Sequence, residues 1–252
     1  MVKLKERLTA SSVHLGLSLC LAAIAALLVF TAWYPWPYRE VSGGRDLFLI
    51  LVSVDVILGP LITLVIFDRR KPVRELVTDL SVVGVIQLAA LAYGLWTVAV
   101  ARPVHLVFEV DRLRVVHAVD VPEELLPQTP PGIRPEPWTG PTMLAVRPFR
   151  DAAEQGTMTM QALQGIQLAA RPDLWQPWAD ARDRVLAAAH SVESLERKLP
   201  TKAALIDAAL QRAGRDARDT LYLPMVSRKL AWTAFLDPKT AKVVGFAPLD
   251  SF

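Results

Sequence analysis

Three long apolar runs near the start of the chain constrain its fold more than any other feature. They cover residues 13–32, 47–67 and 80–101. An α-helix rises 1.5 Å per residue, so each run of about 20 residues reaches across the ~30 Å hydrocarbon core of a bilayer. The sequence therefore predicts a membrane protein, with a three-helix transmembrane bundle over residues 1–101 and a second domain over residues 102–252.

The first run is also compatible with a secretory signal peptide, because it follows the basic residues Lys3, Lys5 and Arg7. Two features favour an uncleaved anchor. The apolar stretch is longer than the roughly 7–15 residues of a signal peptide, and no small-x-small cleavage site follows it at Phe30–Tyr34. We therefore expect the run over 13–32 to remain as a transmembrane helix.

The placement of the cations predicts the orientation of the helices. The loop between the second and third runs is short and basic, like the N-terminus, whereas the cations of the first loop are offset by acidic neighbours. The positive-inside rule places basic loops in the cytoplasm, so the second domain is expected outside, which in a bacterium is the periplasm. Four aromatic residues are then expected to form a belt at the outer interface: Trp33, Tyr34, Trp36 and Tyr38.

The second domain is predicted to be α+β, with a small antiparallel sheet of four to five strands and two or three helices. A β-hairpin is expected over 104–121, turning at Asp111. A second strand region occupies 221–226, 231–236 and 242–246, with a turn at 237–240. Helices are expected over 151–170, 179–199 and, capped by Thr201, 201–214. Between them, residues 122–141 form a proline-rich loop without regular structure, expected to pack through Leu125, Leu126 and Trp138.

Charge and motifs narrow the classes of function. Residues 102–252 contain 19 basic and 18 acidic side chains, so the net charge of +3 reflects membrane topology and nucleic-acid binding is not expected. The sequence contains no glycine-rich phosphate loop and no HExxH, CxxC or GxSxG motif. The single cysteine, Cys20, lies in the first run and excludes an internal disulfide.

Two histidines are the best candidates for a metal pair. A hairpin centred near Asp111 would place His105 and His117 roughly opposite each other, close enough to share an ion. No third ligand is in view, so two exposed strand positions are the favoured interpretation.

Asp55 is the most unusual residue of the membrane segment. A carboxylate near the middle of a bilayer costs at least ~2.5–3.5 kcal/mol, so it normally faces protein. Gly59 follows one turn later, Pro60 frees a backbone carbonyl, and Gln87 lies at a similar depth on the third helix. The simplest hypothesis is a hydrogen bond between the Asp55 and Gln87 side chains. The alternative is that Asp55 and the Gly59-Pro60 notch face a transmembrane helix of a partner. Asp79 is expected to cap the third helix.

An ordered series of short motifs resembles a known family. It consists of Trp36-Pro37, Gly43-Gly44, Leu51, Asp55, Gly59-Pro60, Lys71, Asp79-Leu80, Gln87, the string Ala90–Gly94 and Arg102-Pro103. The series is similar to that of the TfpX/TfpZ family of type IV pilin accessory proteins, which includes FimB-like fimbrial assembly proteins. The resemblance is strongest over residues 33–120 and returns at Tyr222-Leu223-Pro224 and in the C-terminal hairpin.

The resemblance implies a bacterial inner-membrane protein that acts beside the major type IV pilin and supports pilus assembly and twitching motility. It implies no enzyme activity and no cofactor; the expected partners are pilin, other pilus components and membrane lipid. The hypothesised partner-binding residues are Asp55, Gly59, Pro60, Gln87, Trp36 and Arg102. Two other classes stay open: a membrane-anchored periplasmic ligand sensor, and a stabilising subunit of another envelope complex.

Overall fold

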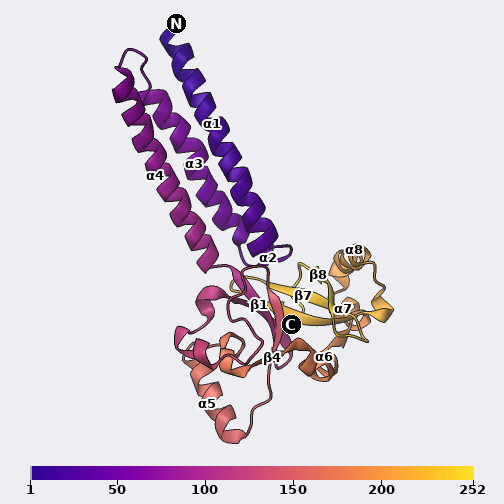
Figure 1. Cartoon of the computed structure of the whole chain (residues 1–252). Coiled ribbons are helices and arrows are strands. Elements are labelled where there is room, and N and C mark those ends of the chain that lie inside the picture. The colour runs from indigo at the N-terminus through magenta and orange to yellow at the C-terminus, as the bar shows by residue number, and fades with distance from the viewer. Residues whose placement is uncertain (1) are drawn as a thin grey trace.

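The protein consists of a bundle of three long helices that stands on a sheet domain (Figure 1). The computed structural model describes residues 2–252, with side chains from Leu4 onward, so the side chain of Lys3 lies outside the described residues. Helix α1 (Val2–Leu28) continues through a π-helical turn at Val29–Trp33. The other two long helices are α3 (Gly44–Ile66) and α4 (Val73–Val100). All three are long and apolar enough to cross a membrane, which confirms the predicted class.

The third long helix begins earlier than predicted. Its N-cap is Pro72, and Asp79 lies two turns inside the helix, where its carboxylate binds Lys71 Nζ at 2.5 Å. The prediction that Asp79 caps this helix is therefore wrong. The proline fixes the backbone at the start of the helix, and the helix begins there even though the apolar run starts later.

The chain between the first two long helices packs onto the sheet domain. A short helix, α2 (Tyr38–Val41), buries Tyr38 and Val41 in the same hydrophobic cluster as the sheet residues Leu106 and Leu223. Trp33 and Tyr34 are also buried in protein, whereas Trp36 is 44% exposed. The predicted aromatic belt is therefore wrong for three of its four residues, because the loop that carries them is part of a folded core.

The sheet has eight strands, in the order β4-β3-β1-β2-β6-β7-β8, with β5 paired to β6. The predicted hairpins are confirmed as β1 (Pro103–Glu109) with β2 (Arg112–His117), and β6 (Leu221–Val226), β7 (Ala231–Leu236) and β8 (Val243–Ala247). The strands absent from the prediction are β3 (Thr142–Val146), β4 (Trp175–Pro177) and β5 (His190–Ser191). Most pairs are antiparallel, but β3 runs parallel to β1 and β6 runs parallel to β2.

The helices of the sheet domain are shorter than predicted. They are α5 (Ala152–Leu163), α6 (Arg182–Ala188), α7 (Val192–Lys198) and α8 (Ala203–Ala213). The helix predicted over 179–199 is interrupted because His190 pairs with Tyr222, after which the Ser191 hydroxyl caps α7. Thr201 caps nothing; it lies in a 3₁₀ turn before α8. The proline-rich loop is not wholly irregular either, since Glu123–Gln128 forms a 3₁₀ helix.

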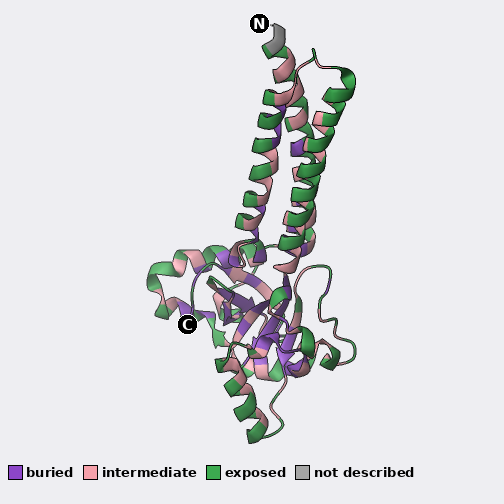
Figure 2. Ribbon diagram, turned by 90° about the vertical axis from the view of Figure 1, so that its left-hand side faces the viewer, coloured by how far each residue is buried: buried purple, intermediate pink, exposed green. Residues whose placement is uncertain are grey.

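Both faces of the sheet carry a hydrophobic core, as the alternation of side chains along a strand requires. Leu106 and Phe108 lie in one cluster together with Val185 of α6, and Val107 lies in a second cluster together with Trp175. Figure 2 shows these buried residues concentrated in the sheet, while much of the outer surface of the three long helices is exposed. An apolar surface of that kind is suited to contact with lipid.

Candidate functional site

The three long helices enclose a groove that opens away from the sheet domain. Helix α3 lies between α1 and α4 and packs against both. Near the sheet domain the bundle is closed by a cluster that includes Val29, Phe48 and Val98. Farther along, the helices line a cavity of about 200 Å³ and a second cavity of about 650 Å³ next to it. We call these two adjoining cavities the Asp55 groove; its defining residues are His14, Leu17, Ser18, Asp55, Gly84 and Gln87.

Polar side chains of α1 bind α3 along this groove. His14 Nδ1 lies 2.6 Å from Thr63 Oγ1, and the Ser11 hydroxyl donates to the Pro60 carbonyl at 2.8 Å. These residues were not predicted from the sequence. A signal was present, since Ser11, His14 and Ser18 are spaced three and four residues apart and so share one face of a helix.

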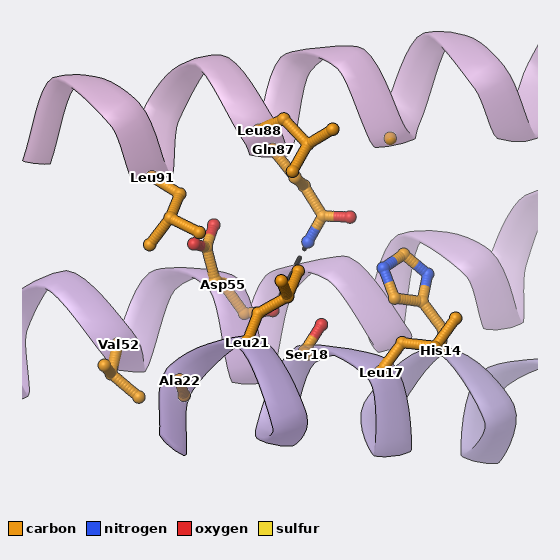
Figure 3. A pocket seen from close by; sticks show the side chains of 11 residues that line it. His14, Leu17, Ser18, Leu21, Ala22, Val52, Asp55, Gln87, Leu88 and Leu91 are labelled. Carbon is orange, nitrogen blue, oxygen red and sulfur yellow. Dashed lines mark hydrogen bonds between the residues drawn. The ribbon is translucent and has the colours of Figure 1, made fainter. Parts of the chain in front are cut away.

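Asp55 and Gln87 lie at the same depth, as predicted, but their hydrogen bond differs from the expected one. Gln87 Nε2 donates to the main-chain oxygen of Asp55 at 3.3 Å, so the predicted bond between the two side chains is wrong (Figure 3). The Asp55 carboxylate points toward α4, and Asp55 and Leu91 line the same cavity. Among the side chains described, from Leu4 onward, and the main chain of residues 2–252, no group donates a hydrogen bond to this carboxylate. Asp55 therefore brings an unsatisfied acceptor to the groove.

Gly59 and Pro60 lie inside the bundle. Both are buried, and a Cβ atom on Gly59 would overlap the Gln87 amide. Glycine at this position therefore lets α3 and α4 approach closely. These two residues shape the groove from within, and the contact with a partner that was hypothesised for them stays a prediction.

Trp36 and Arg102 lie at the junction of the bundle and the sheet domain. The Trp36 ring packs edge-on against Phe246, with centroids 5.7 Å apart, and leaves much of its surface exposed. The Arg102 guanidinium donates to the Ala99 carbonyl at 2.7 Å and to the Pro137 carbonyl at 3.5 Å. Arg102 therefore satisfies the end of α4, a role that cations commonly have at helix C-termini.

The two candidate metal histidines are buried and do not converge. The register pairs His105 with Val116, one residue from His117, so alternation along the strand separates the two rings. His105 binds Thr142 Oγ1 at 2.7 Å and the Pro135 carbonyl at 2.8 Å, and burial lowers its pKa to about 4 despite the second bond. The interpretation of both as exposed strand positions is wrong, because they lie within the folded domain.

His117 belongs instead to an ionic cluster next to the bundle. Its Nδ1 lies 3.0 Å from Asp120 Oδ2, and Arg228 binds the other oxygen of the same carboxylate. Burial acts to raise the pKa of Asp120, but the hydrogen bonds from His117 and Arg228 outweigh it and hold the pKa at about 2. This cluster joins the β2 end of the sheet to the loop before β7.

Comparison with known proteins identifies the family. The model of the fimbrial assembly protein FimB matches residues 2–43. The fimbrial assembly protein of serogroup I from Dichelobacter nodosus is 35% identical over 244 residues, which cover 96% of this chain and 95% of the relative. The chain belongs to the FimB family of fimbrial assembly proteins. A second relative, of serogroup E1 from the same organism, is 34% identical over 244 residues, again 96% of this chain and 95% of the relative.

This family assignment confirms the sequence resemblance. The matched segment of the FimB model contains the α1 residues of the groove, and the two long alignments extend over nearly the whole chain. No solved structure matches the protein.

Proposed function

We propose that this FimB-family protein is an accessory protein of type IV pilus assembly that binds the major pilin at the inner membrane. The observation that carries this proposal is the similarity to fimbrial assembly proteins, which covers 96% of the chain and includes the sheet domain as well as the membrane helices. The similarity extends over both the membrane helices and the sheet domain, which supports a shared role in pilus assembly. Support for twitching motility is the expected consequence.

The proposed orientation places the N-terminus in the cytoplasm and the sheet domain in the periplasm. The N-terminus and the loop after α3 lie together at the end of the bundle remote from the sheet domain (Figure 1). Arg7, Arg69 and Lys71 lie at that end, in accord with the positive-inside rule.

Each part of the molecule has a proposed role in binding pilin. The Asp55 groove, with Gln87 at its wall and Gly59 and Pro60 shaping it, would contact the membrane helix of pilin. Trp36 offers an exposed aromatic surface just outside the bundle, where a partner leaving the membrane would pass. Arg102 would keep this junction in place, and the sheet domain would face the periplasmic part of pilin.

Deletion of the gene tests the proposal. The expected result is loss of surface pili and of twitching, with the total amount of pilin transcript unchanged. Normal pili in the deletion strain would refute the proposal, and a changed pilin transcript would favour the sensor alternative.

The membrane part is tested by co-purifying pilin with the full-length chain. Asp55→Leu should reduce the recovered pilin, whereas Val54→Leu, which changes an exposed residue one position away, should not. Equal recovery with both variants would remove the groove from the proposal.

A further inference from the structure

We infer that the Asp55 groove seats a single transmembrane helix of a partner, and that this helix carries a side-chain hydrogen-bond donor at the depth of Asp55. The donor is an amide, hydroxyl or ammonium group. The inference rests on the proposed function, since it specifies the chemistry of the partner at the same groove.

The bundle leaves an open groove, in its half remote from the sheet domain, against which a fourth helix can pack. Because α3 lies between α1 and α4, the two outer helices form the walls of the groove and α3 forms its floor. His14, Leu17 and Gly84 line both cavities, so the two cavities adjoin between the level of Asp55 and the end remote from the sheet domain. A Cβ atom built on Gly84 would meet nothing within 4 Å, so the backbone of α4 is open to close approach there. Small residues serve this purpose between membrane helices.

The chemistry of the groove selects a donor. The Gln87 amide is engaged with the Asp55 main-chain oxygen, and the His14 ring is engaged with Thr63. Within the described residues, the Asp55 carboxylate receives no hydrogen bond, and it sits at the midpoint of α3. An acceptor at this depth is costly unless a donor reaches it.

The same chemistry argues against the other occupants of a membrane groove. A lipid acyl chain would fill the apolar part of the space but has no donor to offer. The main chain of a transmembrane helix uses its N–H groups internally, so the donor must come from a side chain. Such a side chain donates a hydrogen bond to the Asp55 carboxylate when the carboxylate is ionised. An amide, which both donates and accepts, can also pair with the Asp55 carboxyl group when that group is protonated.

Synthetic membrane helices test this inference without pilin. The full-length chain, carrying an acceptor dye at its N-terminus, is reconstituted in phosphatidylcholine vesicles with donor-labelled Leu/Ala peptides of about 21 residues. One peptide has Asn at its centre, the second has Leu there, and the third has Asn moved by one helical turn. Energy transfer measures the affinity of each peptide for wild type and for the variants Asp55→Leu, Asp55→Asn and Val54→Leu.

The expected result is that the centred Asn peptide binds wild type about 3- to 20-fold more tightly than the Leu peptide, the range of hydrogen bonds between membrane helices. The preference should weaken when Asn is moved by one turn. It should disappear in Asp55→Leu, and persist in Asp55→Asn, which keeps an acceptor oxygen, and in Val54→Leu.

Equal affinity for all three peptides would overturn the inference, as would a preference that survives in Asp55→Leu. Self-association of the chain that depends on Asp55 and excludes the peptides would also overturn it, in favour of a second copy as occupant. The comparison of peptides on wild type does not depend on how well any variant folds. A donor preference together with failure to bind pilin would refute the proposed function but not the donor chemistry assigned to the groove.

Discussion

His105 should make the sheet domain lose stability as the pH falls from 6.5 to 4. Burial lowers the pKa of this histidine from 6.5 to about 4, so the unfolded chain binds a proton more readily than the folded one within this window. The free energy of unfolding therefore falls as the pH falls through the window. At about 1.4 kcal/mol per pH unit, the full loss amounts to about 3 kcal/mol.

The assay is hydrogen exchange of the β1 and β3 amides in the full-length chain, held in detergent micelles from pH 7 to pH 4 and corrected for intrinsic exchange rates. The matched variant is His105→Gln, whose amide can still donate to the Pro135 carbonyl but does not titrate in this range. Wild type should lose protection between pH 6.5 and 4 more steeply than the variant. The carboxylates with depressed pKa values, such as Asp120 at about 2, begin to lose their stabilisation only near pH 4.5 and do so in both proteins, so the comparison with the variant cancels their effect. Parallel pH profiles for the two proteins would refute the reasoning.

Three further predictions concern packing and charge. Tyr38→Ala should lower the free energy of unfolding of the sheet domain by about 3 kcal/mol, because it empties a buried aromatic site. Thermal melting compares this variant with Arg39→Ala, which changes an exposed neighbour, and equal melting temperatures would contradict the prediction. Gly59→Ala should lower the thermal stability of the bundle in micelles, because the new methyl group displaces the amide facing it, whereas Gly84→Ala meets open space and should not. Glu154→Gln should increase exchange in the first turn of α5 at neutral pH. Hydrogen bonds from arginine hold the Glu154 pKa at about 2, so the difference from wild type should vanish as the pH falls from 4.5 to 2.

The parts of the fold that sequence could predict are those with a local signal. Apolar length predicted the three long helices, and turn residues such as Asp237 predicted the C-terminal hairpin. Strands β3, β4 and β5 are short and pair with segments far away in the chain. Strand β5 has only two residues, too few to show the alternation that is typical of a strand. The sequence over 179–199 therefore gave no local indication that a strand interrupts the predicted helix.

The candidate site was predictable in composition but not in geometry. Asp55 and Gln87 were predicted because a carboxylate inside a membrane segment is rare and an amide lies at a similar depth. The Gln87 amide binds the main-chain oxygen of Asp55 because α3 and α4 pack closely at Gly59. This packing involves two helices, so the spacing of residues within one helix does not predict it. The spacing of the polar residues of α1 indicates that they share one face. No single one of them is unusual enough to point to that face.

The short helix α2 has a practical consequence for dissecting this protein. Tyr38 and Val41 come before the second long helix in the sequence, yet they complete a core whose other members follow the third. In addition, the Gly140 amide donates to the Ala32 carbonyl at 2.5 Å, a second link from the early chain to the late one. A soluble fragment that begins at Arg102 would leave an apolar hollow open to water. A fragment intended for crystallisation or partner mapping should therefore carry residues 35–43 as well, joined to the later chain by a linker in place of the two intervening membrane helices.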